Sequence, residues 1–486
     1  MQKDLVAVIG AGLSGLSAAV RLSNKGIPTV VVEAGEAIGG CCSTELVDGF
    51  RFNNGAVYGA VPSLLKHALS RLDIDADSHL RLRPIAVPQL GIFESGTRVF
   101  TTDVGHSWIE GENAQARTAI YRIELARLYE TWRPLYRRLI REVLPHDLSL
   151  ARVLTRLWRY LPQMAGSVAG VLEKGFSDPE ARAALGAVTL YTGLAPQNTP
   201  AAQIIGLLGL LDEGFFLPEG GMGSISEAIA RKALSNGVRI RLNSKAKKIE
   251  FGNGRLRGVR LDNGELIAAR TIIATNSAWD VVANMLEPDV VTAALRRRVK
   301  RSPLSHRAIS IQLGIQPAAG FAPAAFAVNH VPLLEEQYRF HLPAHDTARW
   351  FAYTNPTSVM PELAPDGAAI VEMFAPVPPR ERAEHIQPDE VNAIADRYIA
   401  GLQARYPFRI VAKRVVGPVD FMRRRHLYEG ALYGLAPGAK PGDFFPRRMG
   451  GTDLYLAGQS TYPGYGVPPA ILTGVHAADA VIRQRG

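Results

Sequence analysis

Cysteine is scarce in this sequence. Only Cys41 and Cys42 occur among 486 residues, and they are adjacent. Neighbouring Cα atoms lie about 3.8 Å apart, which is closer than the ~4.4–6.8 Å that a disulfide bond usually spans. A disulfide framework of the kind found in small secreted proteins is therefore excluded. We expect a cytoplasmic protein in which both thiols are reduced.

Long hydrophobic runs are also lacking. The nearest to one, AAQIIGLLGLL from Ala201, ends at Asp212 and Glu213. A membrane-spanning helix needs about 20 apolar residues, so we expect no transmembrane segment. The glycine-interrupted N-terminal run is too short for a signal peptide. The sequence has no cluster with metal-ligand spacing and no basic tail, so we expect neither a bound metal nor a nucleic-acid partner.

Arginine, by contrast, is abundant. The formal net charge is +10, and residues 115–160 contain ten arginines against four acids. Leucines, tyrosines, Trp132 and Trp158 are interleaved with these arginines. Basic amphipathic helices of this kind bind anionic membrane surfaces. A solvated helical face is the alternative, so peripheral attachment to the inner face of a membrane stays open at this point.

The chain opens with one βαβ unit. LVAVIG predicts a buried strand, LSGLSAAVRLSNKG a helix, and PTVVVEA a second buried strand. Gly10, Gly12 and Gly15 form G-x-G-x-x-G between the first strand and the helix, and Glu33 ends the next strand. This complete context predicts a dinucleotide whose pyrophosphate lies at the helix N-terminus.

Each residue of this fingerprint has its own physical task. Gly10 makes the turn, Gly12 lets the backbone approach the pyrophosphate, and Gly15 lets the helix pack closely on the strand. Glu33 is expected to accept hydrogen bonds from ribose hydroxyls. A second pair, Gly39-Gly40, is another place where the backbone can lie close to a cofactor.

Further along, the sequence predicts a helical stretch over residues 112–175 and a β meander from Gly237. Asn253-Gly254 and Asn263-Gly264 each separate two alternating runs, which predicts tight hairpins. The buried strand TIIATN follows the meander. A second mixed α/β region covers residues 303–443, and the chain ends with the strand DLYLAG, a loop and the helix PAILTGVHAADAVIRQ.

The order and spacing of these blocks resemble the FAD-dependent amine oxidase and phytoene desaturase superfamily. The matching blocks are VIGAGLSGLSAAVRL, VVVEAGEAIGG, GFRFNNGAVYG, YTGLAPQNTPA, FLPEGGMGSISEAIA, LDNGELIAARTIIATN, GALYGL and LYLAGQSTYPGYGVPPAILTG. They extend over nearly the whole chain. The PEGGMGSI and YLAGQSTYPGYGVP blocks are most similar to the carotenoid desaturase and isomerase branch.

The resemblance implies an α/β fold with a Rossmann-type (GR2-like) FAD-binding domain, a mixed α+β substrate domain and a helical insertion. The FAD-binding domain is expected to be discontinuous, formed by residues 1–75, 213–300 and 444–486. The substrate-binding domain is expected to comprise residues 76–212 and 301–443, with the helical, membrane-facing candidate at 112–175.

The resemblance also implies FAD as the cofactor, bound between the first βαβ unit and the C-terminal strand, loop and helix. In relatives the meander contacts the adenine end, here around residues 245–248, and the last helix directs its N-terminus at the flavin. The cofactor-binding positions implied are Gly10, Gly12, Leu13, Ser14, Gly15, Glu33, Ala34, Gly39, Gly40, Cys41, Gly55, Ala56, Val57, Ala246, Gly458, Gln459, Gly466, Val467 and Ala470.

Two of these positions depart from the family pattern. Many relatives have an arginine after the double glycine, beside the FAD phosphates, where this chain has Cys41. Amine oxidases often have an acid where this chain has Gln459. We expect Cys41 and Cys42 to be small, close-packed spacers, because buried cysteine behaves as a small hydrophobe. A redox thiol or a covalent flavin anchor is the alternative.

On the substrate side, the resemblance brings Tyr58, Tyr433, Tyr462 and Tyr465 near the flavin as candidate catalytic residues, with ordinary packing as the alternative. It implies desaturation or isomerisation of a hydrophobic substrate such as a polyene or another isoprenoid. Only one G-x-G-x-x-G is present, so oxygen or a quinone is the expected electron acceptor unless the reaction is redox-neutral. His426, which follows three arginines, is interpreted as part of a basic surface turn.

Two other functions stay open. One is a flavin oxidase that acts on a C–N or C–OH bond of a smaller amine or alcohol, for which an aromatic cage around a closed pocket would be evidence. The other is a non-enzymatic binder of prenylated proteins, of the GDP-dissociation-inhibitor type. The intact phosphate-loop glycines count against this last function.

Overall fold

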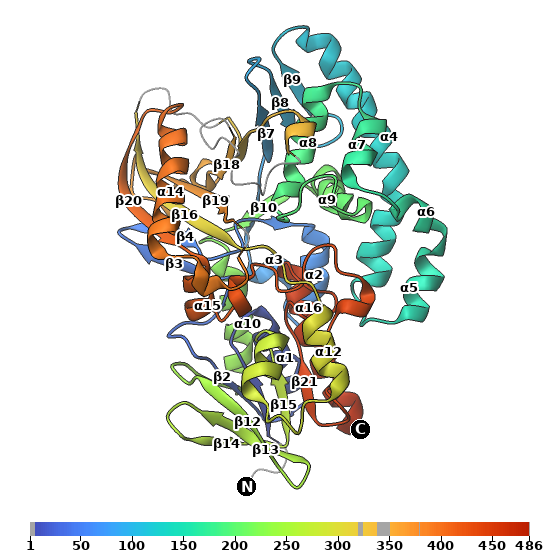
Figure 1. The fold of residues 1–486 in the computed structure, drawn as a ribbon, viewed down its shortest axis with the longest axis vertical. Coiled ribbons are helices and arrows are strands. Elements are labelled where there is room, and N and C mark those ends of the chain that lie inside the picture. Colours follow the sequence, from blue (N-terminus) through green and yellow to red (C-terminus); the bar gives the residue numbers. More distant parts are fainter. Residues whose placement is uncertain (1–4, 319–323, 338–349, 379, 486) are drawn as a thin grey trace.

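The computed structural model describes residues 5–318, 324–337, 350–378 and 380–485 (Figure 1). Three bodies are visible in the ribbon. A sheet with its helices lies at the bottom, a large antiparallel sheet lies at the upper left, and a group of helices lies at the upper right. In the described part of the chain, no helix is both long and apolar enough to cross a bilayer, and no group of side chains is suited to hold a metal ion.

The lower body is built on a five-stranded parallel sheet in the order β11-β2-β1-β15-β21. Every residue of β1, β2 and β15 is buried, as expected for a parallel sheet covered on both faces. The strands are β1 (Val6–Ile9), β2 (Thr29–Val32), β11 (Arg239–Arg241), β15 (Thr271–Ala274) and β21 (Leu454–Leu456).

Helix α1 (Leu13–Ser23) packs between α10 (Gly223–Ser235) and α16 (Val467–Arg485). The meander covers the opposite side of the sheet and consists of β12 (Ala246–Gly252), β13 (Arg255–Leu261) and β14 (Leu266–Ala268). The segments that carry the two ends of the chain therefore meet in one body, which confirms the predicted Rossmann-type arrangement.

The two predicted hairpins differ from each other. Gly252 pairs with Arg255, so Asn253 and Gly254 form a two-residue turn in which both φ angles are positive, as a type I′ turn requires. In the second hairpin the Leu261 N–H donates to the Glu265 carbonyl at 2.8 Å, and only Gly264 is left-handed. The predicted hairpin is confirmed there too, with a loop of three residues that ends in a left-handed glycine.

The upper-left body is an eight-stranded, mainly antiparallel sheet in the order β20-β16-β19-β18-β17-β7-β8-β9. A three-stranded sheet and a hairpin join it to the lower body. The strands are β3 (Thr44–Val47), β4 (Phe50–Asn53), β5 (Gly59–Ala60), β6 (Leu82–Pro84), β7 (Gln89–Ile92), β8 (Arg98–Thr101), β9 (Trp108–Glu110), β10 (Phe215–Pro218), β16 (Ala308–Pro317), β17 (Ala327–His330), β18 (Phe351–Thr354), β19 (Ala369–Pro376) and β20 (Phe408–Val416).

The helical insertion follows β9 and forms the upper right of Figure 1. Its helices are α4 (Ala114–Arg138), which continues as a π-helical turn (Leu139–Val143), α5 (Leu150–Leu157), α6 (Leu161–Met164), α7 (Val168–Gly175), α8 (Pro179–Leu190) and α9 (Ile205–Glu213). The other α-helices are α2 (Pro62–Ser70), α3 (Ala76–His79), α11 (Ala278–Asp280), α12 (Ala293–Arg301), α13 (Leu334–Gln337), α14 (Pro388–Gln403) and α15 (Pro418–Arg425).

The arginine-rich stretch is not uniformly turned to solvent. Arg117 forms ion pairs with Asp178 and Glu180 at 2.6 and 2.7 Å, and Trp132 is buried. Trp158, in contrast, is 58% exposed. The two tryptophans therefore do not share one face, and the exposed apolar surface is concentrated in α5 and α6.

Candidate active site

One large cavity, of about 1560 Å³, is bordered by all three bodies. Residues of β1, β2 and α1 line one end, and strands of the eight-stranded sheet line another part. The insertion contributes aliphatic residues, among them Val153 and Leu157. The volume exceeds the ~300–1,000 Å³ of a typical ligand pocket, so there is room for a dinucleotide and a substrate.

The glycine fingerprint shapes the narrow end of this cavity. Gly10 has φ +99°, which favours glycine, and a Cβ on Gly15 would lie 1.9 Å from the Gly10 carbonyl oxygen. A Cβ on Gly12 would meet no atom within 4 Å, and Gly12 lines the cavity. The space left beside Gly12, at the N-terminus of α1, fits a bound pyrophosphate.

Glu33 is held in place by the same turn. Its Oε2 accepts a hydrogen bond from the Ala11 N–H at 2.7 Å, and its Oε1 accepts one from the Gly35 N–H at 2.8 Å. The carboxylate lines the cavity one strand away from the glycine turn. Its remaining lone pairs are suited to ribose hydroxyls, as the fingerprint predicts.

The starts of α1 and α16 are joined by hydrogen bonds. Ser14 donates from Oγ to the Ala470 carbonyl at 2.8 Å, and Thr473 donates from Oγ1 to Ser14 Oγ at 2.9 Å. The Gly458 N–H donates to Thr473 Oγ1 at 2.9 Å. The C-terminal loop and helix are thereby fixed against the glycine turn.

The structure brings the expected cofactor positions together. All of them line the cavity except Gly15, which packs behind Gly10. Around the meander, Lys245 and Ala246 reach the cavity lining. Lys248 points elsewhere, since its Nζ pairs with Glu287 at 2.9 Å.

The two cysteines have different surroundings. Both line the cavity, but Cys42 is buried and donates from Sγ to the Met222 carbonyl at 3.2 Å, whereas Cys41 is half-buried. Burial raises the pKa of both thiols, that of Cys42 to about 12, and the charge of Arg425 only partly offsets this for Cys41. Both sulfurs therefore stay protonated near neutral pH, which favours the spacer hypothesis over a reactive thiolate.

One interpretation from the sequence is wrong. His426 was expected in a basic surface turn, but it lines the cavity together with Arg423, Arg424 and Arg425. Helix α15 ends at Arg425, and His426 is left-handed with φ +54°, so the chain turns over the cavity. Burial lowers the pKa of His426, and the charge of Glu33 opposes the shift. A run of charged residues alone gave no signal of this placement.

The four candidate tyrosines all line the cavity. Tyr58 stacks on Phe215 at a centroid distance of 4.4 Å, and the rings of Tyr433 and Tyr465 lie 4.7 Å apart. Tyr433 donates from its hydroxyl to the Tyr191 carbonyl at 2.6 Å. Burial raises the pKa of each of the four, that of Tyr433 to about 12. These rings form aromatic walls and stay neutral.

A buried acid in the cavity lining was not predicted from the sequence. Glu372 on β19 accepts hydrogen bonds on Oε1 from the Asn53 N–H at 3.2 Å and from Gln312 Nε2 at 3.3 Å. Its Oε2 has no hydrogen-bond partner among the described residues. Burial raises the pKa of Glu372 to about 7, against the opposing effects of these donors and of Arg414. The sequence had indicated only a mixed α/β region over residues 303–443.

The fold and this site define a dinucleotide-dependent enzyme of the Rossmann class. Residues 13–482 match the family described as flavin containing amine oxidoreductase. The chain therefore belongs to that family, its dinucleotide is FAD, and it is a flavin-dependent oxidoreductase.

Among curated relatives, the chain is 25% identical to the zeta-carotene-forming phytoene desaturase of Myxococcus xanthus, over 96% of this chain and 92% of that protein. It is 27% identical to hydroxyneurosporene desaturase of Rhodobacter capsulatus, over 99% and 98% of the two chains. These similarities agree with the branch that the sequence blocks indicated.

Two solved structures show the same fold. An oxidoreductase from Methanosarcina mazei has a TM-score of 0.65 at 16% identity, covering 99% of this chain and 100% of the other. Putrescine oxidase bound to putrescine has a TM-score of 0.62 at 18% identity, covering 99% of both chains. At these identities the likeness concerns the fold alone.

A side chain at Gly12 is expected to displace FAD. Gly12→Val places two methyl groups in the open space beside the N-terminus of α1, and the flavin content of the purified protein should fall at least about tenfold. Gly175→Val, at the end of α7, is the matched control because a Cβ there also meets no atom within 4 Å. A folded Gly12→Val protein with normal flavin content would contradict the assignment.

The cysteine pair is expected to be dispensable for chemistry. Cys41→Ala with Cys42→Ala should keep FAD and most of the turnover, with a loss of stability of about 1–3 kcal/mol for the two removed sulfurs. Acid precipitation should release flavin from the wild type and from the double variant alike. Flavin that stays attached to the wild-type pellet but not to the variant would show a covalent anchor instead.

Glu372 is expected to make stability fall as pH rises. Its folded-state pKa of about 7 lies above the ordinary value of 4.5, so the stabilisation is complete below pH 4.5 and is lost as pH rises through 7. The loss amounts to up to about 3 kcal/mol. Thermal unfolding of wild type and Glu372→Gln between pH 5 and 8 measures it, and equal pH dependence in both proteins would exclude Glu372 as the cause.

Proposed function

We propose that this chain desaturates or isomerises a hydrophobic polyene or another isoprenoid. The observation that carries the proposal is that the cofactor end of the cavity continues into a space walled by aromatic and aliphatic side chains. The desaturase relatives, similar over nearly the whole chain, support the same substrate class.

The residues that would hold FAD follow from the geometry of the cavity. The α1 N-terminus and Gly12 would take the pyrophosphate, and Glu33 would take the adenosine ribose. Gly466 and Val467, at the start of α16, would place a helix N-terminus near the flavin ring, where it stabilises negative charge. When bound, FAD supplies the acceptor for a hydride removed from carbon.

The chain itself would bind, orient and shield the substrate. Tyr58, Tyr433 and Tyr465 give the cavity an aromatic wall along which an extended polyene can lie, while Val153 and Leu157 add aliphatic surface. Positioning of this kind lowers the entropic part of the barrier. The tyrosine hydroxyls are not needed as bases, since those of Tyr433 and Tyr465 bond to protein oxygens.

The two other functions are less well supported. Buried tyrosines would also suit the aromatic cage of an amine or alcohol oxidase, but here the cavity extends beyond them to the aliphatic side chains of the insertion, among them Ile140, Val153 and Leu157, which a small polar substrate does not need. A non-enzymatic prenyl-protein binder has no need of the intact glycine fingerprint. Oxygen or a quinone remains the proposed electron acceptor.

The substrate class is tested by anaerobic reduction of the flavin. The holoenzyme is mixed with acyclic polyenes in detergent, with primary amines and with alcohols, and the flavin absorbance is followed. We expect bleaching with a polyene and none with amines or alcohols. Val153→Asp, which puts a charge into the aliphatic wall, should slow bleaching at least about tenfold, while the exposed Leu234→Asp on α10 should not. Bleaching by amines alone would overturn the proposal.

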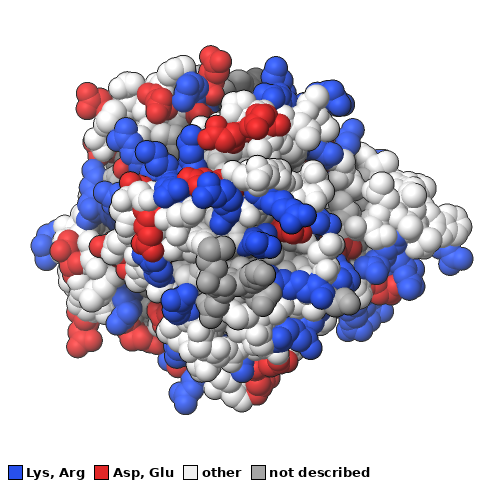
Figure 2. All heavy atoms as spheres, turned by 90° about the horizontal axis from the view of Figure 1, so that it is seen from below, with Lys and Arg blue, Asp and Glu red and all other residues white. Residues whose placement is uncertain are grey.

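We also propose that the protein attaches peripherally to an anionic membrane through α5 and α6. Leu150, Leu154, Trp158 and Leu161 are each at least half exposed. Arg141 and Arg159 are exposed nearby. Seen from below, the projection at the right of Figure 2 shows uncharged atoms bordered by Lys and Arg side chains. The same apolar face of α5 continues from Leu150 and Leu154 to Val153 and Leu157 in the cavity wall, so an apolar substrate would have a short path from the bilayer.

Membrane attachment is tested with vesicles. Leu154→Gln with Trp158→Gln removes two of the exposed apolar side chains and should weaken co-sedimentation with anionic vesicles at least about tenfold, because each buried side chain contributes roughly 1.5–3 kcal/mol. Leu234→Gln, equally exposed at 57% but on α10, is the control. Binding of the wild type should also weaken at high salt. If the wild-type protein does not co-sediment with anionic vesicles at low salt, the proposed attachment is refuted.

A further inference from the structure

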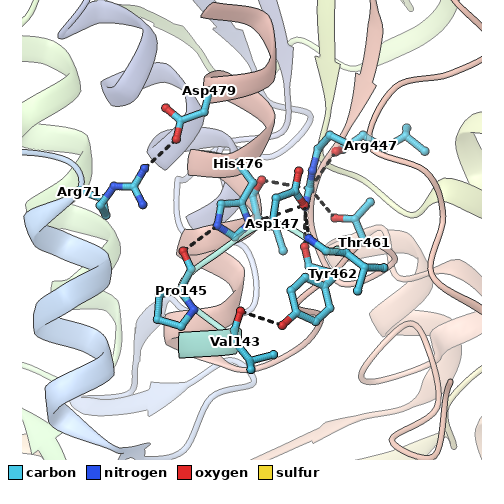
Figure 3. A network of polar contacts seen from close by, with 12 residues as sticks. Arg71, Val143, Pro145, Asp147, Arg447, Thr461, Tyr462, His476 and Asp479 are labelled. Atoms are coloured by element: carbon cyan, nitrogen blue, oxygen red, sulfur yellow. Dashed lines mark hydrogen bonds and ion pairs between the residues drawn. The ribbon is translucent and has the colours of Figure 1, made fainter. Parts of the chain in front are cut away.

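A second cavity, of about 420 Å³, lies outside the flavin cavity. It is bordered by one face of α16, by the C-terminal end of α2 and by the loop that leads into α5. Figure 3 shows part of its wall, including Arg71, Pro145, Asp147, His476 and Asp479. The other lining residues are His146, Leu148, Ser149, Arg152 and Arg483.

Positive charge dominates this pocket. Its two acids are already paired, Asp479 with Arg21 and Arg71 at 2.7 Å each, and Asp147 with Arg447 at 2.9 Å.

Arg152 and Arg483 make no ion pair among the described residues, so their charges are available to a ligand. Burial lowers the pKa of His146, and the charges of Arg152 and Arg71 lower it further. The pocket is thus suited to an anion.

A buried histidine forms part of the wall of the same pocket. His476 is 3% exposed, and its Nε2 donates a hydrogen bond to the Pro145 carbonyl at 3.1 Å (Figure 3). Its buried Nδ1 lies 3.9 Å from Asp147 Oδ1. Burial lowers the pKa of His476 to about 4, so the ring is neutral at pH 7. The ligand that fits offers an anion to Arg152 and Arg483.

The surroundings indicate where such a ligand comes from. The pocket opens at the N-terminus of α5, which favours negative charge. The exposed Leu150 and Leu154 follow on the same helix. A phosphate beside an apolar surface is the chemistry of an anionic phospholipid, with its phosphate in the pocket and its acyl chains along α5.

We propose that this pocket binds the phosphodiester of an anionic phospholipid through Arg152 and Arg483, and so fixes the protein on the membrane. The proposal rests on the proposed membrane attachment of α5 and α6 and assigns it one specific contact. Lipid binding in the pocket would be saturable and would depend only on the residues of the pocket, unlike general attraction of the membrane by surface arginines.

The test compares two pairs of arginines. Arg152→Gln with Arg483→Gln empties the pocket of its unpaired charges, whereas Arg127→Gln with Arg137→Gln removes two exposed charges elsewhere on the insertion. Each basic residue near an anionic surface is worth about fivefold in binding, so both pairs weaken vesicle binding. Only the pocket pair should abolish saturable, one-to-one binding of soluble dihexanoyl phosphatidylglycerol by the holoenzyme, measured by calorimetry.

The outcomes distinguish an error in the lipid pocket from an error in the membrane attachment. Equal lipid titrations for the pocket pair and the control pair would overturn the pocket while leaving membrane attachment intact. If the wild-type protein binds no vesicles, the proposed membrane attachment through α5 and α6 is itself wrong. Inorganic phosphate that binds as tightly as the lipid would show a free-phosphate site and refute the lipid.

A separate observation concerns the segment Arg423–Arg425 at the flavin cavity. Arg424 has no ion pair or hydrogen bond among the described residues, and Arg425 lies 3.4 Å from Glu45. The charge of Arg425 acts on Cys41, the residue that follows the double glycine. Gly39 in turn donates its N–H to the Ala11 carbonyl at 2.8 Å, beside Gly12.

We infer that Arg425, assisted by Arg424, supplies positive charge to the FAD pyrophosphate, which the neutral Cys41 cannot do. A charge-assisted hydrogen bond is worth about tenfold or more in binding, so Arg425→Gln should release FAD at least about tenfold faster. Its release should also depend less on salt than that of the wild type.

Release is measured on the holoenzyme by the recovery of flavin fluorescence at several salt concentrations. Arg414→Gln is the matched control, because Arg414 pairs with the same Glu45 at 3.1 Å but does not line the cavity. A wild-type release rate in Arg425→Gln would overturn the inference. Faster release with unchanged salt dependence would also overturn it, because it would indicate a structural effect.

Discussion

The close approach of α1 and α16 is the constraint on which the rest of the structure depends. A Cβ on Gly474 would lie 2.0 Å from the Ser14 carbonyl oxygen, and one on Gly15 would lie 1.9 Å from that of Gly10. Glycine at these two positions lets the first and last parts of the chain share one wall of the cavity. The glycine turn, Glu33 and the start of α16 can then act on one cofactor, although more than 400 residues separate them.

The cavity combines two environments that require opposite chemistry. At its phosphate end, backbone N–H groups, Glu33 and several basic side chains surround the space that FAD needs. Beyond the flavin position, neutral aromatic and aliphatic residues take over. A polyene offers no group to pair with buried charges, so burial of uncharged surface and exact placement of the reacting carbon do most of the work in the proposed reaction.

The sequence predicted the features that depend on local backbone requirements. Gly10 is left-handed with φ +99° whatever surrounds it, and the βαβ unit and Glu33 lie where the fingerprint placed them. Asn253-Gly254 forms the expected turn for the same reason. At Asn263-Gly264 the same residue types form a longer loop, because the position of the pairing strand β14, and not the dipeptide, decides the loop length.

What the sequence could not supply are contacts between distant segments. His426 and its arginines resemble a surface turn until the left-handed residue at the end of α15 turns them over the cavity. Trp132 and Trp158 are alike in sequence context, yet packing of α4 buries only the first. The pKa of Glu372 is raised because packing of the surrounding strands buries the carboxyl group, and the hydrogen bonds from Asn53 and Gln312 only partly oppose that shift.

The central claim is that bound FAD and a polyene react in the same cavity. A single anaerobic turnover tests it most directly, with stoichiometric holoenzyme and an acyclic polyene and with the product analysed by mass spectrometry and chromatography. The account predicts either a product two hydrogens lighter together with bleached flavin, or an isomer of unchanged mass with oxidised flavin. Recovery of the polyene unchanged, from an enzyme that is reduced by an amine under the same conditions, would contradict it.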